Sequence, residues 1–341
     1  MTSGERRLEA PHRRLEAGPR LLEKTVVAAY RTASWVIGRI PKGIATAVIG
    51  RFAQLSYLLW PSKRRWSNAN FGHVLGLPPD HPRVRRLALA AYREYATYIV
   101  EVMRLPRVSP ERAATFVSPI ELDRVLEIRK GSEGGLIFAV GHVGNNDAVA
   151  AGIAGRGLPI SVVADDSAYP ELFDDFRRLR ESWGVHVIPW RNLREIFAVL
   201  RKREMLALLV DWGYRSDGIP VRLFDAWTTL PSGPATLAAK TKSRILPITI
   251  RRSDSGVFHV SWAEPIEVAS SEPAELQRAT QAMADALAAT IAAAPSQWYS
   301  FKPMWPASPA EQRELKARAE AMLTDAAGGD PGGSTEDAAA R

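Results

Sequence analysis

Short apolar runs rich in β-branched residues recur along the middle of the chain and predict strands. These runs occupy residues 136–142, 160–165, 185–190, 205–211, 245–250 and 258–263. Between several of them, apolar residues recur at three- and four-residue steps and predict amphipathic helices over residues 146–155, 170–183, 192–203 and 233–242. Because strands that alternate with helices build parallel sheets, the pattern predicts an α/β fold with a central, mostly parallel sheet flanked by helices.

The two ends of the chain have a different pattern. Helical periodicity without strands covers residues 25–40, 42–60 and 82–105, and one more Ala-rich helix is expected over residues 272–294. The sequence therefore predicts four parts, which are a polar, mobile leader (1–24), an amphipathic helical region (25–110), an α/β core (111–305), and a helix fragment with a disordered tail (306–341).

Positive charge is concentrated near the amino terminus. The net charge is +8, and residues 24–79 hold eight basic residues and no acidic one. A local basic surface indicates an anionic partner, either lipid headgroups or nucleic acid. Since the basic residues alternate with apolar and aromatic helical positions, we interpret the region as helices that lie in the membrane headgroup plane. Core helices with solvated basic side chains are the alternative.

The most apolar stretch, residues 43–60, is interpreted as interfacial. Arg51 lies at its middle, where a charge costs roughly 2.5–3.5 kcal/mol in a bilayer on insertion scales. The first 23 residues mix acids, bases and proline without an apolar segment, so no secretory signal is expected.

Composition narrows the chemistry. The chain has no cysteine, which excludes disulfides, cysteine-ligated zinc and a thiolate nucleophile. Its six histidines do not pair at metal-ligand spacing, so no metal site is expected.

The strongest candidate for chemistry is GHVGNND, residues 141–147. His142 directly follows an apolar run and is expected at the carboxyl end of a strand, where open α/β sheets bind ligands. Asn145, Asn146 and Asp147 favour the start of a helix, and a turn of this length can bring the Asp147 carboxylate onto the His142 ring. His142 would then deprotonate a substrate hydroxyl that attacks an activated carbonyl directly, without a covalent enzyme intermediate. A structural histidine is the alternative.

Five sequence blocks extend the motif. They are RIPKGIATAVIGRFAQLSYLLWPSKRRWSNANFGHVLG, AVGHVGNND, FRRLRESWGVHVIP, LLVDWGYRSDGIPVRLFDAWTTLPSGPATLAAKTKSRILPITI and PSQWYSFKPMWP. In this order, over residues 28–305, they resemble the bacterial lysophospholipid-acyltransferase superfamily. The most similar branch holds lipid A lauroyl/myristoyl acyltransferases and actinobacterial phosphatidylinositol mannoside acyltransferases.

The resemblance implies that His142 is the general base and Asp147 its orienting acid. Arg180 matches a basic position of the third block and would hold a phosphate or help neutralise the thioester oxyanion. Arg177 is an alternative for this role, and Glu181 is expected to pair with either arginine. A solvated arginine and a surface ion pair are the corresponding alternatives.

Other positions of these blocks are candidates for binding. Ser232 and Gly233 form a tight turn before a helix, where backbone N–H groups can bind an anion, although an ordinary connection would look the same. Asn145, Asn146 and Asp211 are expected to line the pocket, with a helix or turn cap as the alternative for Asp211.

These observations predict a membrane-associated O-acyltransferase that moves a fatty acyl group from a thioester to a hydroxyl of a glycolipid or lysolipid. We expect no cofactor, acyl-CoA or acyl carrier protein as co-substrate, and a monomer on the cytoplasmic face of the inner membrane. The alternatives are a non-catalytic membrane protein, a thioesterase, and a nucleic-acid-binding protein, which the apolar setting of the charge disfavours. Leu223, Phe224, Asp225 and Lys302 depart from the family pattern and leave the acceptor open.

Overall fold

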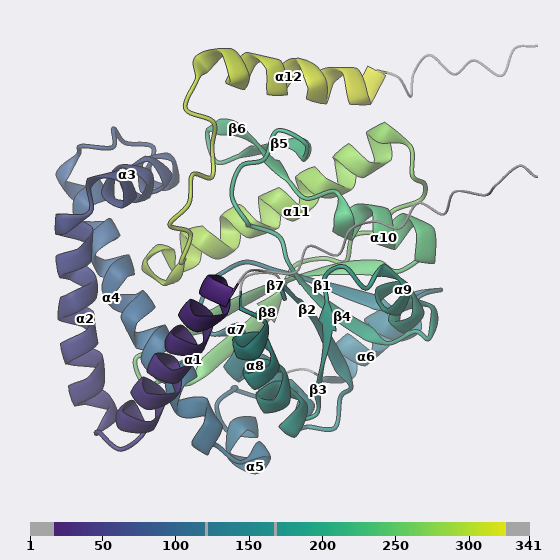
Figure 1. Cartoon of the computed structure of the whole chain (residues 1–341). Coiled ribbons are helices and arrows are strands. Elements are labelled where there is room, and N and C mark those ends of the chain that lie inside the picture. Colours follow the sequence, from purple (N-terminus) through teal and green to yellow (C-terminus); the bar gives the residue numbers. More distant parts are fainter. Residues whose placement is uncertain (1–16, 120–121, 167–168, 325–341) are drawn as a thin grey trace, which may run out of the picture.

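A mostly parallel sheet forms the centre of the protein (Figure 1). The computed structural model describes residues 17–119, 122–166 and 169–324. Within these residues the main sheet has six strands in the order β3-β2-β4-β1-β7-β8. They are β1 (Leu136–Val140), β2 (Ile160–Ala164), β3 (Val185–Pro189), β4 (Met205–Leu209), β7 (Arg244–Arg252) and β8 (Phe258–Trp262). All neighbours pair in parallel except β7 and β8, which confirms the predicted α/β class and its mostly parallel sheet.

Strand order decides which loops meet. β1 lies between β4 and β7, and Leu136 of β1 pairs with Met205 of β4. Ile160 of β2 pairs with the same Met205. Because parallel strands end at a common edge, the residues that follow β1 and β4 lie side by side.

Helices cover both faces of the sheet (Figure 1). One face carries α7 (Asn146–Ala154) and α8 (Pro170–Ser182), and the other carries α9 (Leu193–Arg201), α10 (Gly233–Thr241) and α11 (Pro273–Ala293). Phe138 and Val140 of β1 join the buried cluster on the first face, and Ile137 and Ala139 join the cluster on the second. This alternation follows from the two-residue period of a strand.

The amino-terminal helices are α1 (Ala17–Ile37), α2 (Lys42–Leu59), α3 (Pro61–Leu75) and α4 (Pro82–Arg104). α2 packs along α4 through a face that includes Ala45 and Tyr57. α1 begins earlier than the expected residue 25, and residues 1–16 of the expected leader lie outside the described residues. Of the helices in the described ranges, none combines the length and hydropathy needed to cross a membrane.

Several elements have no counterpart in the sequence-based expectation. They are α3, α5 (Pro110–Ala114), α6 (Leu122–Lys130), the short 3₁₀ helices η1 (Leu105–Arg107) and η2 (Pro295–Gln297), and the hairpin of β5 (Ile219–Leu223) and β6 (Ala226–Leu230). α12 (Pro309–Thr324) falls where a carboxyl-terminal helix fragment was expected. The expected disordered tail lies outside the described residues.

Candidate active site

His142 lies in the turn that connects β1 to α7. A hydrogen bond joins the backbone of this turn to a segment near the carboxyl terminus, since Tyr299 N donates to the His142 carbonyl at 2.8 Å. Gly144 has a φ of +70°, and a Cβ there would lie 2.7 Å from the Ile250 side chain. Only glycine combines this φ with so close an approach, so the turn can pack directly against Ile250 of β7.

Asp211 is the carboxylate that contacts the His142 ring. It follows β4, the strand beside β1, and its Oδ1 lies 2.6 Å from His142 Nδ1. Both carboxylate oxygens accept from the His142 backbone N–H, at 3.0 and 2.9 Å, and Oδ2 accepts from the Trp298 indole at 2.9 Å. Asp211 is 2% exposed. A buried carboxylate with this many donors fixes the ring orientation and makes Nδ1 the protonated nitrogen, which leaves Nε2 for chemistry.

The two groups change each other's proton affinity. Burial lowers the pKa of His142, but the charge and the hydrogen bond of Asp211 outweigh burial and raise that pKa above its usual value. Burial raises the pKa of Asp211, but the imidazole and the N–H donors lower it below its usual value. Asp211 therefore stays ionised beside a histidine of increased basicity, which suits a general base.

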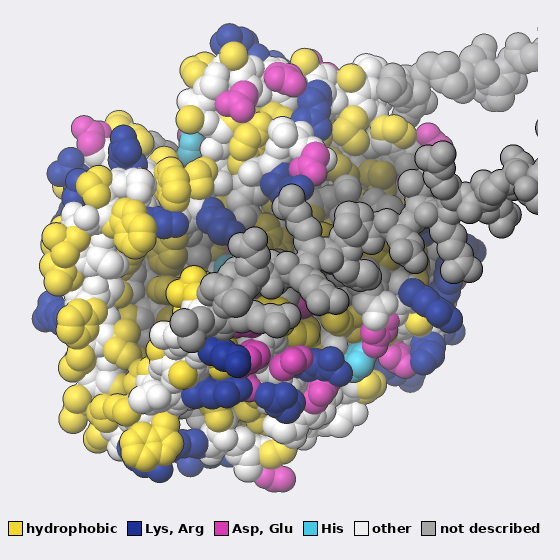
Figure 2. Space-filling model, viewed as in Figure 1, with side chains coloured by type: hydrophobic (Ala, Val, Ile, Leu, Met, Phe, Trp, Pro, Cys, Tyr) yellow, Lys and Arg dark blue, Asp and Glu magenta, His cyan; other side chains and the backbone are white. Residues whose placement is uncertain are grey.

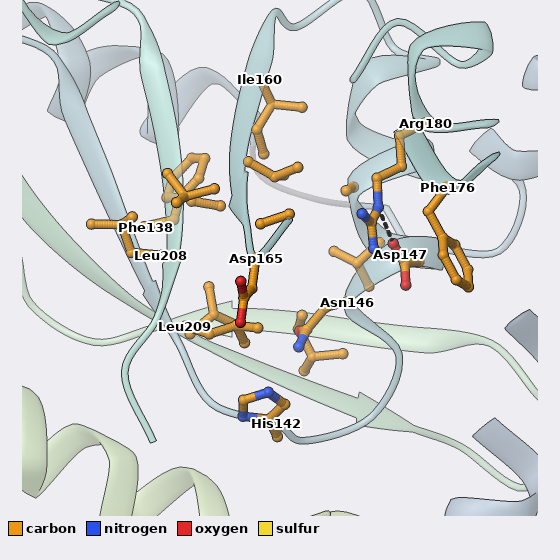
Figure 3. A pocket seen from close by; sticks show the side chains of 18 of the residues that line it. Phe138, His142, Asn146, Asp147, Ile160, Asp165, Phe176, Arg180, Leu208 and Leu209 are labelled. Carbon is orange, nitrogen blue, oxygen red and sulfur yellow. Dashed lines mark hydrogen bonds and ion pairs between the residues drawn. The ribbon is translucent and has the colours of Figure 1, made fainter. Parts of the chain in front are cut away.

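The expected contact between Asp147 and His142 is corrected by this geometry. Asp147 lies in the first turn of α7 and faces α8, where its Oδ1 accepts from Arg180 Nε at 2.7 Å (Figure 3). Burial lowers the pKa of Arg180, and the Asp147 carboxylate reverses this effect and raises it. Burial and the Asp147 charge also raise the pKa of the nearby Tyr30 to about 12. Asp147 and Arg180 therefore form a half-buried ion pair between two helices, away from the imidazole.

A cavity of about 390 Å³ begins at His142 and extends between the sheet and helices α7 and α8. The strands line it with apolar side chains, among them Phe138, Val140, Ile160, Val162, Ala207 and Leu209. Asn146 lines the cavity near His142, and the Asp147–Arg180 ion pair lines it farther from the imidazole (Figure 3). The arrangement suits a long apolar substrate group whose reacting end lies beside the imidazole.

The other predicted site residues are distributed as follows. Arg177 and Glu181 form an exposed ion pair at 2.9 Å on α8 and are not among the residues that line the cavity. Ser232 and Gly233 line a separate hollow of about 150 Å³ at the start of α10. Asn145 is buried as the cap of α7, accepting from Ala148 N at 3.0 Å.

Asn146 lines the cavity and donates to the Gly141 carbonyl at 3.1 Å. Asp211 lies behind His142 and is not a lining residue.

Sequence reasoning missed the two tryptophans of the site. Trp298 binds Asp211, and the Trp212 ring stands edge-on to the His142 ring with 5.6 Å between centroids. Trp298 belongs to the block PSQWYSFKPMWP. Its contact with Asp211 joins residues 87 positions apart, so the block alone does not reveal that contact.

A cluster of charged side chains around Arg252 is hydrogen-bonded to the turn that holds His142. Arg252, at the end of β7, is buried and pairs with Glu94 and Glu101 of α4. Glu101 also accepts from the Asn145 amide at 3.2 Å and pairs with Lys42 of α2 at 2.9 Å. This cluster connects α2, α4 and β7 to the cap of α7, so two amino-terminal helices are bonded to the turn that holds His142.

The sequence is similar to known acyltransferases. The family model described as bacterial lipid A biosynthesis acyltransferase matches residues 18–306. A phosphatidylinositol mannoside acyltransferase of Mycolicibacterium smegmatis is 28% identical over 291 residues, which cover 83% of this chain and 93% of the relative. A protein of the same name from Mycobacterium tuberculosis is 31% identical over 264 residues, which cover 73% of this chain and 79% of the relative. The chain belongs to the bacterial lipid A biosynthesis acyltransferase family and is an acyltransferase.

Proposed function

We propose that this acyltransferase moves a fatty acyl group from an acyl thioester to a hydroxyl of a glycolipid, with His142 as general base. The observation that carries the proposal is the apolar cavity that begins at the His142 ring, with Asp211 bound to the opposite side of that ring. The names of the relatives concern phosphatidylinositol mannosides, and we take a glycolipid of this kind as the acceptor.

In the proposed reaction, Asp211 holds the Nδ1 proton of His142 while Nε2 takes the proton of the acceptor hydroxyl. The acceptor oxygen attacks the thioester carbonyl and forms a tetrahedral intermediate. The intermediate then expels the thiolate as the C–S bond breaks, and the imidazolium returns its proton to the departing sulfur. The products are an ester and a free thiol, and no covalent bond to the enzyme forms.

The register of the sheet supports a proposal for the length of the acyl group. The cavity reaches from His142 to Ile160, which lies level with Leu136, six residues before His142 on β1. Six residues of strand span roughly 20 Å. An extended alkyl chain advances roughly 1.25 Å per carbon, given a C–C bond of about 1.5 Å and an angle near 111°. These values favour an acyl chain of roughly 16 carbons.

The direct test supplies the purified protein with acyl-CoA donors of increasing chain length and a phosphatidylinositol mannoside acceptor. We expect an esterified glycolipid, with kcat/KM highest near palmitoyl-CoA and lower for chains several carbons longer. Mass spectrometry of the lipid product measures the transfer. Free fatty acid as the main product would contradict acyl transfer and favour a thioesterase.

We further propose that α2 docks on an anionic membrane surface. Its outward face carries a stripe of apolar side chains that are between 46% and 72% exposed, which are Ile44, Val48, Phe52, Leu55 and Leu59. Figure 2 shows hydrophobic side chains along the edge of the molecule where α2 lies. Arg51 lies within the helix, and no acidic residue occurs between Lys24 and Pro79. An exposed apolar stripe with basic neighbours is typical of helices that lie in a membrane interface.

The double variant Phe52→Glu, Leu59→Glu is expected to lose binding to phosphatidylcholine vesicles that contain phosphatidylglycerol. Each apolar side chain that leaves water contributes about 1.5–3 kcal/mol, so we expect at least a tenfold weaker partition. Vesicle flotation measures the effect. Leu323→Glu on α12 makes the same change at another exposed leucine and should bind as the wild type does. Equal binding of the double variant and the wild type would contradict docking through α2.

A further inference from the structure

The segment that contains Lys302 is fixed beside the active site by a buried side chain. Asn70 of α3 is 1% exposed and donates to the carbonyls of Ser300, at 3.0 Å, and Lys302, at 2.7 Å. Its Oδ1 accepts from Met304 N at 3.1 Å. The backbone on both sides of Lys302 therefore has a defined position, and only the lysine side chain is free to adjust.

This side chain extends toward the active site. Lys302 Nζ lies 5.7 Å from the centroid of the Trp212 ring, and the Trp212 ring stands edge-on to His142. Gly213 has a φ of +104°, and a Cβ there would lie 3.5 Å from Lys302 Cβ, so the turn after Trp212 packs directly against the lysine. The Trp212 indole, which lines the cavity, thus lies close to both the Lys302 ammonium and the His142 imidazole.

Within the described residues, the ammonium of Lys302 has no carboxylate partner. Among the ion pairs of the described residues, none includes Lys302. The neighbouring cation Arg215 is different, because Asp217 binds it through two hydrogen bonds of 2.9 and 2.8 Å. The nearby Asp211 is already bound by His142 and Trp298. An exposed ammonium on a fixed backbone beside the imidazole can attract and bind an anion.

We propose that Lys302, supported by the Trp212 ring, determines specificity by binding a phosphate of a substrate at the mouth of the cavity. The inference rests on the proposed function, in which both substrates carry phosphate. One source is the diphosphate of a CoA donor, and the other is the phosphodiester of the glycolipid acceptor. A lysine ammonium binds either through charge-assisted hydrogen bonds.

The test compares the wild type, Lys302→Gln and Lys302→Arg with matched substrates. Palmitoyl-CoA is paired with S-palmitoyl-N-acetylcysteamine, a thioester without phosphate. Phosphatidylinositol mannoside is paired with an alkyl mannoside, an acceptor without phosphate. We expect Lys302→Gln to raise KM about tenfold for one phosphate-bearing substrate and to leave KM unchanged for its phosphate-free counterpart. Lys302→Arg retains the charge and should remain within about threefold of the wild type. Lys202→Gln, at an exposed lysine beyond α9, is the matched control.

The affected pair identifies the source of the phosphate. A rise confined to the CoA donor assigns the site to the donor, and a rise confined to the phosphatidylinositol acceptor assigns it to the acceptor. Equal changes for phosphate-bearing and phosphate-free substrates, or no change, would overturn the inference.

A second measurement separates this inference from the proposed function. Calorimetric titration with free CoA and with glycerophosphoinositol mannoside needs no turnover. We expect Lys302→Gln to weaken one of the two about tenfold. Unchanged binding of both would overturn the site even in an active enzyme. Absence of acyl transfer by the wild type would instead contradict the proposed function.

Discussion

Replacement of His142 by alanine is expected to lower kcat for acyl transfer by about 10⁴-fold, the upper end of what a positioned general base contributes. The variant loses the imidazole whose Nε2 takes the proton of the acceptor hydroxyl in the proposed reaction. KM for the acyl donor should stay near the wild-type value, because the apolar lining of the cavity is unchanged. Initial rates of glycolipid esterification measure both constants.

The control for this variant is His259→Ala. His259 is an exposed residue of β8, outside the cavity lining, and its loss should leave kcat within about twofold of the wild type. Thermal unfolding of both variants checks that the fold is retained. Activity of His142→Ala within tenfold of the wild type would contradict the general-base mechanism and favour a non-catalytic role for the site.

Much of the fold could be predicted from local patterns. β1 is a run of five residues that are all buried, and such runs appear in a sequence as continuous apolar segments. α2 has bounds close to the expected 42–60 because Pro41 ends the preceding helix and Pro61 starts the next.

Elements that depend on distant contacts were not predictable in the same way. α3 buries Ser67, Asn68 and Asn70, so its sequence shows no apolar stripe. The Asn70 amide donates to a carbonyl 230 residues away, and the sequence around Asn70 does not indicate that partner. The β5–β6 hairpin turns at Phe224 with a φ of +53°, a conformation that usually favours glycine or asparagine, so the turn had no sequence signal.

The same limit explains the partner of His142. Its own position follows from an apolar run that stops at a strand end, which a sequence displays. Asp147, five residues away, was the local candidate for its partner, whereas the carboxylate in contact is Asp211, 69 residues away. The sequence placed Asp211 at the end of another strand, but only the strand order, with β4 beside β1, brings the two ends together.

Asp211→Asn tests which of the two carboxylates, Asp211 or Asp147, orients the His142 ring. We expect kcat to fall about 10³-fold, because the amide no longer stabilises the imidazolium or holds the reactive tautomer. The base acts only when it is deprotonated, so activity falls as the pH drops through the pKa of His142. Asp211 raises that pKa. Loss of the Asp211 charge therefore moves the acidic limb of the pH–rate profile to lower pH. The charge of Lys302, which is still present in this variant, also lowers the pKa of His142.

Asp147→Asn is the matched comparison, since it makes the same substitution at the other carboxylate considered as the partner of His142. It breaks the ion pair with Arg180 and leaves the hydrogen bond between His142 and Asp211 in place. The acidic limb should therefore stay at its wild-type position, whatever loss of rate the unpaired Arg180 causes. Profiles of kcat/KM against pH for the two variants and the wild type, measured with palmitoyl-CoA, decide the matter. A limb that moves in Asp147→Asn but not in Asp211→Asn would return the orienting role to Asp147 and require the turn after β1 to rearrange when substrate binds.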